Sequence, residues 1–235
     1  MPTLRLDKII ADSGPMTRSE AAALIKGGRV NVNGIPVASA AGRYDPVKVV
    51  ISIDGRILEY SRFRYIMMNK PYGYVSSTED RRDKTVMELL DHKYSRLGIF
   101  PAGRLDKDAE GLLLLTNDGD LAHRITSPSK KIDKRYFVEF DGSLSAEDIK
   151  AFETGITLGD GTKCLPAILE AVPGGAVITV NEGKYHQVKR MMGAVGKHVK
   201  YLKRIAIGGL LLDEELKPGE YRDLQDEVSL IFYEK

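Results

Sequence analysis

The sequence predicts an α+β protein with a small domain over residues 1–60 and a larger domain over residues 61–235. Two helical patterns and a hairpin pattern fit within the small domain, a polar segment at residues 59–64 follows them, and strand-like and helical segments alternate in the rest of the chain. With 235 residues, 43% hydrophobic and 29% charged, the chain has a globular composition and is long enough for two cores.

The small domain begins with two predicted helices. Apolar residues recur at helical spacing in residues 4–14, which indicates a short amphipathic helix. Thr17 and Glu20 have the spacing of a capping box, and the second helix is expected to run from there to Gly27-Gly28.

A hairpin and a further strand complete the small domain. Valines alternate before Asn33-Gly34 and apolar residues resume after it, which is the pattern of a two-residue hairpin turn. Residues 47–53 then predict a strand that ends at Asp54-Gly55.

The larger domain is predicted to open with a strand that ends in a turn at residues 70–73, where Pro71 cannot donate to a strand ladder. Thr85 and Glu88 again have capping-box spacing and predict a short helix. The remaining elements are predicted as strands at 136–140 and 176–180, helices beginning at Ser145 and spanning 188–195 within the segment 181–204, a strand near 207–212, a turn at Pro218-Gly219 and a closing element.

A charged cluster precedes the most apolar stretch of the larger domain. Arg104, Asp106 and Asp108 are followed by Leu112–Leu115, a run that is too short for an ordinary helix and indicates a buried strand with a turn at Asn117–Gly119. Asp106 then lies at the edge of a core element, where a carboxylate costs free energy unless it is solvated, paired or hydrogen-bonded. It is therefore a candidate functional group, with a solvated loop of mixed charge as the alternative.

Positive charge is concentrated in segments, although the net charge is only +2. Lys and Arg outnumber Asp and Glu by ten to six in residues 1–64 and by seven to one in residues 181–204, but are outnumbered by eight to three in residues 213–235. This segregation favours a basic face that binds a phosphate backbone, with ordinary solvated faces as the alternative.

Several classes of protein are disfavoured. A single cysteine, Cys164, excludes an internal disulfide framework, and neither a signal peptide nor a membrane helix is indicated, so we expect a cytoplasmic protein with no membrane partner. The four histidines lack metal-ligand spacing and no phosphate-binding glycine motif occurs, so we expect no metal and no nucleotide cofactor.

Four motifs occur in an order that resembles a known family. They are KPYG at residues 70–73, GRLDKDAEGLLLLTNDGDLAHRITSP at 103–128, KRY at 134–136 and EGKYHQVKRM at 182–191. The set closely resembles the pseudouridine synthases of the RsuA type, and residues 4 to about 50 resemble the S4 RNA-binding domain. Residues 194–224 are also similar to the branch that modifies small-subunit ribosomal RNA.

The resemblance implies a larger domain built on a mixed, mainly antiparallel sheet with flanking helices. It also implies isomerisation of uridine to pseudouridine without a cofactor. The expected partner is small-subunit ribosomal RNA or its assembly intermediate, and the expected state is a monomer.

The resemblance implies roles for individual residues. Asp106 would be the catalytic carboxylate, Tyr136 would stack on the uracil and could assist proton transfer, and Lys189 would pair with Asp106. Arg104 would occupy the space that a flipped uridine leaves. The other basic residues expected to bind RNA are Lys70, Arg5, Lys8, Arg18, Lys26, Arg29, Lys184 and Arg190.

Two other functions stay open. A non-catalytic ribosomal RNA-binding or assembly factor could keep the same fold, although the intact set of Asp106, Tyr136 and Lys189 argues against it. A glycoside or N-glycosidic hydrolase could use Asp106 and Asp108 as paired carboxylates, although their surroundings are basic and lack the aromatic platforms that sugars favour.

Overall fold

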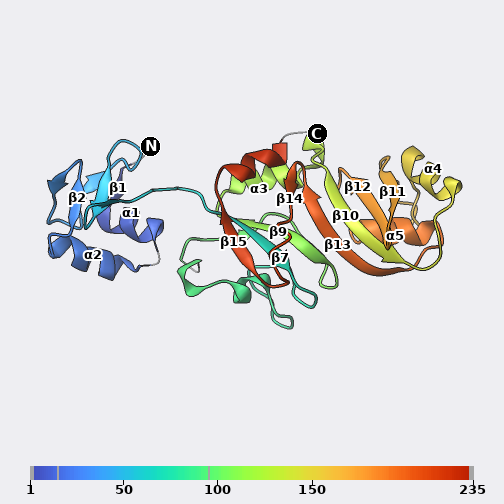
Figure 1. Ribbon diagram of the computed structural model, residues 1–235, viewed down its shortest axis with the longest axis horizontal. Helices are drawn as coiled ribbons and strands as arrows, with labels where there is room; N and C mark the ends of the chain where they lie inside the picture. The colour runs from blue at the N-terminus through green and yellow to red at the C-terminus, as the bar shows by residue number, and fades with distance from the viewer. Residues whose placement is uncertain (1–2, 15, 95, 233–235) are drawn as a thin grey trace. The chain divides into compact units, whose positions relative to one another are not determined.

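The computed structural model describes residues 3–14, 16–94 and 96–232, and the chain forms two compact units. The smaller unit comprises Met1–Phe63 together with Asp91–Leu97, and the larger comprises Arg64–Leu90 and Gly98–Lys235 (Figure 1). The described residues include no helix that is both long and apolar enough to span a membrane.

The smaller unit packs a helix pair and short strands around one core. Its elements are β1 (Leu4–Arg5), α1 (Leu6–Ser13), α2 (Arg18–Lys26), β2 (Val30–Val32), β3 (Ile35–Pro36), β4 (Arg43–Tyr44), β5 (Ile51–Ile53), β6 (Arg56–Ile57) and the 3₁₀ turn η2 (His92–Tyr94). The strands form a β1-β4 pair and a sheet in the order β3-β2-β5-β6. Both predicted helices are confirmed, and their apolar faces supply most of the core.

Local sequence chemistry explains these elements. Thr17 and Glu20 form the predicted capping box at the start of α2. Asn33 and Gly34 both adopt positive φ, as the tight turn between β2 and β3 requires. The strand predicted over residues 47–53 begins only at Ile51, because the Asn33 side chain accepts a hydrogen bond from the Val50 amide and residues 46–49 form a turn.

The larger unit is built on one extensive sheet. Its strands are β7 (Tyr65–Lys70), β8 (Phe100–Pro101), β9 (Glu110–Thr116), β10 (Lys134–Phe140), β11 (Ile168–Val172), β12 (Gly175–Val180), β13 (Val199–Ile207), β14 (Leu210–Leu211) and β15 (Tyr221–Leu224). Its helices are α3 (Gly119–Thr126), α4 (Ala146–Thr154) and α5 (Gln187–Ala194), with 3₁₀ turns η1 (Val86–Leu89), η3 (Pro128–Lys130) and η4 (Asp226–Phe232).

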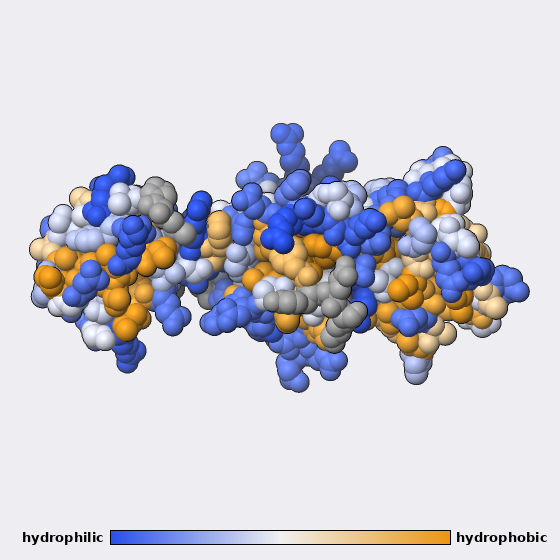
Figure 2. Space-filling view, turned by 90° about the horizontal axis from the view of Figure 1, so that it is seen from above, coloured by the Kyte–Doolittle hydropathy of each residue, from blue (hydrophilic) through white to orange (hydrophobic). Residues whose placement is uncertain are grey.

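The sheet runs in the order β11-β12-β10-β13-β9-β7-β15, with β14 added beside β13 and β8 beside β9. The β9–β13 pair is parallel and the other described pairs of this sheet are antiparallel, which confirms the mixed, mainly antiparallel sheet. Figure 2 shows one face of the molecule, where hydrophobic residues gather over the end of this unit that holds α4, β11 and β12.

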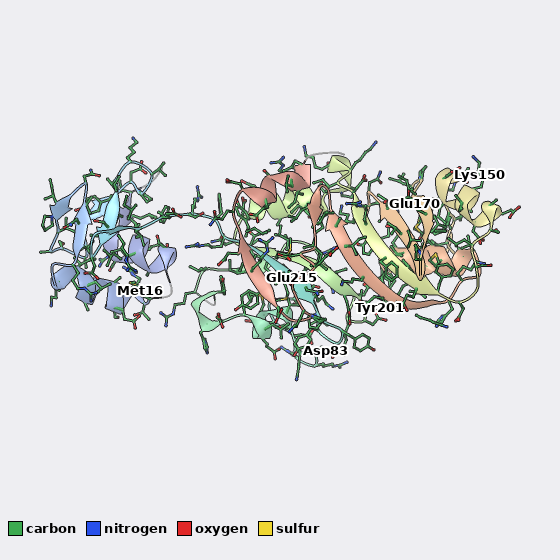
Figure 3. All side chains as sticks on the ribbon, in the orientation of Figure 1. Met16, Asp83, Lys150, Glu170, Tyr201 and Glu215 are labelled. Atoms are coloured by element: carbon green, nitrogen blue, oxygen red, sulfur yellow. The ribbon has the colours of Figure 1, made fainter. Side chains whose placement is uncertain are left out.

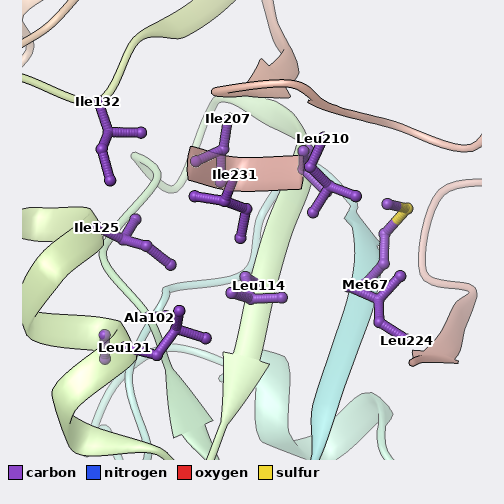
Figure 4. Close-up of a cluster of buried hydrophobic side chains, with 12 residues drawn as sticks. Met67, Ala102, Leu114, Leu121, Ile125, Ile132, Ile207, Leu210, Leu224 and Ile231 are labelled. Carbon is purple, nitrogen blue, oxygen red and sulfur yellow. The ribbon is translucent and has the colours of Figure 1, made fainter. Parts of the chain in front are cut away.

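The leucine run forms the centre of the larger unit. Leu112–Leu115 lie in β9 and are fully buried, so both faces of this strand are covered as the sequence predicts. Leu114 packs with Met67 of β7 and Ile125 of α3 in the core shown in Figure 4.

Segments of the larger unit also differ from the prediction, and the strand predicted near residues 207–212 is divided between the end of β13 and β14. Residues 117–119 do not form a simple turn, because Asp118 caps α3 by accepting a hydrogen bond from the Leu121 amide. The helix expected after Thr85 is reduced to the 3₁₀ turns η1 and η2, although the Thr85 capping box is present. The helix within residues 181–204 ends at Ala194, and after Gly196, which has positive φ, the alternating pattern forms β13.

Candidate active site

One row of paired residues crosses four strands of the larger sheet. Lys70 of β7 lies opposite Gly111 of β9, Gly111 lies opposite Arg204 of β13, and Arg204 lies opposite Tyr136 of β10. Gly111 has a φ of 99°, and a Cβ atom there would lie 2.3 Å from the Arg204 carbonyl oxygen. Only glycine therefore allows β9 and β13 to approach at this point.

The segment between Arg104 and Leu112 carries Asp106 and is held by the turn after β7. The Ser76 hydroxyl both donates to the Leu105 carbonyl and accepts from the Leu105 amide, each at 3.0 Å. The Gly73 amide donates to the Lys107 carbonyl at 2.8 Å. These bonds fix the backbone on both sides of Asp106.

The Lys70 side chain also holds the segment that carries Asp106. Its side chain is fully buried, and its ammonium donates to the carbonyls of Ala109 at 2.7 Å, Pro71 at 3.0 Å and Lys107 at 3.4 Å. Burial lowers the pKa of Lys70 to about 8, although the nearby carboxylates of Glu110, Asp108 and Asp106 favour its charged form. The expected RNA contact of Lys70 is therefore wrong, because no part of this residue reaches the surface.

Arg204 joins the two ends of the segment. It is 4% exposed, and its Nε donates to the Leu112 carbonyl at 2.8 Å while its Nη1 donates to the Arg104 carbonyl at 3.4 Å. Its Nη2 is buried and has no hydrogen-bond partner within the described part of the chain. One guanidinium thus spans the stretch that contains Asp106.

Asp106 faces a cavity of about 510 Å³. Arg104, Asp106, Tyr136 and Lys184 are the predicted site residues that line this cavity, together with Tyr185 and His186. Val180 of β12 and Leu202 of β13 add an apolar wall beside Tyr136. The cavity therefore combines the carboxylate of Asp106, which is 27% exposed, and that of Glu182, which pairs with Lys184, with cationic, aromatic and apolar groups.

The neighbour of Asp106 differs from the expected one. His186 places Nε2 3.5 Å from Asp106 Oδ1, whereas Lys189 forms an ion pair with Asp108 and is not among the described residues that line the cavity. His186 is the N-cap of α5, so Lys189 lies about one turn further along the helix and reaches Asp108 instead. Burial would raise the pKa of Asp108, but the hydrogen bond and charge of Lys189 outweigh it and the pKa is lowered.

The expected RNA-binding residues other than Arg104 and Lys70 differ in their surroundings. In the larger unit, Lys184 pairs with Glu182 and Arg190 pairs with Asp160. In the smaller unit, the ion pairs are Arg5–Asp7, Arg18–Asp7, Lys8–Asp12 and Arg29–Asp54. Lys26 is exposed and forms no ion pair with any described residue.

Asp7 ties the two helices of the smaller unit together. It is buried and accepts hydrogen bonds from Arg5 and Arg18, and the pKa of its carboxyl falls to about 2, chiefly through the Arg5 bond. Arg5 and Arg18 thus have a structural role whether or not they also contact RNA.

Several residues of the site, Tyr185 among them, were not predicted. Ser76 and Arg204 act through backbone groups, and no spacing in the sequence marks such bonds. His186 lies within one of the four motifs, but the histidines were considered only as metal ligands and no role was assigned to His186.

Groups that could support other chemistry are sparse in the described ranges. No cluster of three or more His, Cys, Asp and Glu side chains that could hold a metal ion occurs among these residues. Cys164 is buried, and burial raises the pKa of its thiol, which opposes a nucleophilic role.

Comparison with known proteins gives consistent matches over nearly the whole chain. The family model described as RNA pseudouridylate synthase matches residues 64–194, and the S4 domain model matches residues 4–46. An uncharacterised RNA pseudouridine synthase of Bacillus subtilis is 48% identical over 229 residues, which cover 95% of this chain and 96% of the relative. Ribosomal small subunit pseudouridine synthase A of Escherichia coli is 42% identical over 228 residues, which cover 95% of this chain and 97% of the relative. A solved pseudouridylate synthase structure superposes with a TM-score of 0.67 at 39% identity, covering 97% of this chain and 99% of that one.

Proposed function

The chain belongs to the family of RNA pseudouridylate synthases and carries an S4 domain, and from this premise we propose that it isomerises a uridine of small-subunit ribosomal RNA with Asp106 as the catalytic carboxylate. The Escherichia coli relative, which is named for the small ribosomal subunit and aligns over almost the full length, supports this choice of RNA. The observation that carries the proposal for Asp106 is its position at the cavity, on a segment fixed by Ser76, Lys70 and Arg204.

The reaction breaks the C1′–N1 bond of uridine and forms a C1′–C5 bond, after which the hydrogen on C5 leaves as a proton and N1 gains one. Atoms and electrons balance without a co-reactant. The Asp106 carboxylate can attack or stabilise the sugar at C1′, or it can remove a proton from the sugar to give a glycal. We keep both routes.

The other cavity residues suit this chemistry. Tyr136 lies on the cavity wall, where its ring can stack on the uracil. Arg104 lies at the same opening, where its guanidinium can enter the space left by a flipped base. Lys189 fixes Asp108, two residues after Asp106, so we propose that it acts on the geometry of the segment.

We propose that the smaller unit contributes electrostatic binding to the RNA backbone. Lys26→Ala should weaken binding to any RNA sequence and reduce the slope of log affinity against log salt by about 0.9, because one phosphate contact is lost. Lys163→Ala, an exposed lysine of the larger unit, is the matched control and should leave the slope unchanged. An unchanged slope for Lys26→Ala would remove this residue from the RNA interface.

The activity is tested by tritium release from small-subunit ribosomal RNA labelled at C5 of uridine. We expect release with no change in RNA mass apart from the label, because the uracil stays attached. Free uracil with an abasic site would identify a hydrolase, and binding without release would identify a non-catalytic assembly factor. Release from large-subunit RNA alone would contradict the proposed substrate.

A further inference from the structure

Two aromatic side chains stack at the edge of the cavity. The rings of Tyr185 and His186 have centroids 3.9 Å apart and planes inclined by 16°. Tyr185 is nevertheless 76% exposed, so the ring face that His186 does not cover is open to solvent. Both residues line the cavity that Asp106 faces.

The backbone holds this pair in a defined position. His186 adopts a φ of 48°, a left-handed conformation that costs a non-glycine residue free energy and tends to occur at functional sites. Arg190 stabilises the turn, because its amide donates to the His186 carbonyl at 2.9 Å and its Nη1 donates to the Tyr185 carbonyl at 3.4 Å. Arg190 is itself anchored by Asp160. Hydrogen bonds therefore fix the backbone that carries the exposed Tyr185 side chain.

The position of the pair relates it to the catalytic carboxylate. His186 Nε2 lies 3.5 Å from Asp106 Oδ1, and the ring of Tyr185 stacks on the imidazole. A flat group on the open face of Tyr185 would therefore be separated from the His186 ring by the ring of Tyr185. Because His186, and not Tyr185, is the ring next to Asp106, the open face of Tyr185 suits a base beside the reacting uridine.

We propose that Tyr185 is a stacking platform for the nucleobase adjacent to the target uridine, with His186 as the ring that positions it. This inference rests on the proposed function, because it assigns the RNA at the same site. An aromatic face binds any base and needs no hydrogen bond, so the platform adds affinity without sequence choice. It also keeps the neighbouring base ordered while the target uridine leaves its stack.

The test measures RNA affinity in the full chain with Asp106→Asn, so that turnover does not alter the RNA. The probes are a fragment of small-subunit ribosomal RNA that the wild type modifies, the same fragment with an abasic nucleotide on one side of the modified uridine, and the same with the abasic nucleotide on the other side. Tyr185→Ala is compared with Tyr185→Phe, which keeps the ring. Ile168→Ala, which removes an exposed apolar side chain outside the cavity, is the control.

On the intact fragment, Tyr185→Ala should bind about 5- to 150-fold more weakly, which corresponds to about 1–3 kcal/mol for one stacked base. Tyr185→Phe and Ile168→Ala should stay within about twofold. On one of the two abasic fragments, the alanine and tyrosine forms should bind equally.

A loss of affinity that persists on both abasic fragments, an equal loss in Tyr185→Phe, or no loss in Tyr185→Ala would overturn the platform. Tritium release by the wild type on the same fragment is measured separately. Normal release combined with any of these three results removes only the platform. If small-subunit ribosomal RNA yields no releasing fragment, both the platform and the proposed function are removed.

Discussion

Replacing Lys70 with methionine separates stability from catalysis, because the ammonium is buried yet holds the backbone next to Asp106. Methionine has a similar length but carries no charge and no donor. The two shorter hydrogen bonds of the Lys70 ammonium, to the carbonyls of Ala109 at 2.7 Å and Pro71 at 3.0 Å, would be lost. Hydrogen bonds from a charged group contribute about 1.5–3 kcal/mol each, so the loss is about 3–6 kcal/mol.

The variant also avoids the free-energy cost of burying a charged ammonium, and this saving offsets much of the loss of hydrogen bonds. The pKa of Lys70 falls from 10.5 to about 8, and each pH unit corresponds to about 1.4 kcal/mol, so burying the ammonium costs about 3 kcal/mol near neutral pH. The net destabilisation expected for Lys70→Met is therefore about 0–3 kcal/mol. The variant should fold, but the carbonyls of Ala109 and Pro71 lose their donor and the Lys107 carbonyl keeps only the Gly73 amide.

The expected result is a fall in kcat of at least about tenfold with little change in KM, because a displacement of about 1 Å at the reacting group costs up to about 100-fold. The assay is the initial rate of tritium release, together with urea unfolding. Lys150→Met is the control, because Lys150 is 71% exposed on α4 (Figure 3). Wild-type kcat in a folded Lys70→Met variant would refute the reasoning.

The pH dependence gives a second readout for Lys70. Between pH 8 and pH 10.5 the folded form has lost the Lys70 proton while the unfolded form still holds it. The unfolded state then binds more protons, so stability rises with pH. The wild type should gain up to about 3 kcal/mol relative to Lys70→Met across this range, and a constant difference would contradict the burial argument.

Two further substitutions test the structural account. Asp7→Asn should cost about 2 kcal/mol at neutral pH, because the pKa of Asp7 is about 2 instead of 3.8. This contribution is fully present above about pH 4 and is lost as the pH falls through 2, so hydrogen exchange in α1 should show wild type and variant converging there. Gly111→Ala should destabilise the larger unit by at least about 3 kcal/mol in urea unfolding, because its Cβ would overlap the Arg204 backbone. Gly159→Ala, where no atom lies within 4 Å, should be neutral, and equal effects would refute the close approach of β9 and β13.

Local patterns predicted much of the fold. The capping boxes at Thr17 and Thr85, the helix start at Ser145, the Asn33-Gly34 turn and the leucine strand depend on residues close in sequence, and each is confirmed. The helix α3 was missed because Asp118-Gly119 begins a helix as readily as a turn when apolar residues follow. β11 was also missed, since its pairing with β12 is a tertiary contact.

The site was predicted in part. Arg104, Asp106 and Tyr136 line one cavity, although they come from separate motifs. The prediction that Lys189 pairs with Asp106 was wrong. His186 lies beside Asp106, and Lys189, about one helical turn further along α5, reaches Asp108 instead. The burial of Lys70 and Arg204 was not predicted, since a cation in a motif gives no sign that its hydrogen-bond acceptors are backbone carbonyls.

The central claim is that Asp106 carries the chemistry, and the most direct measurement is tritium release by Asp106→Asn beside Asp108→Asn on the same C5-labelled small-subunit RNA. We predict that Asp106→Asn abolishes release while RNA affinity changes by less than about threefold, because the carboxylate is needed for the reaction more than for binding. Asp108→Asn, which frees Lys189, should release tritium more slowly but measurably. Sustained release by Asp106→Asn, or its loss only in Asp108→Asn, would contradict the claim.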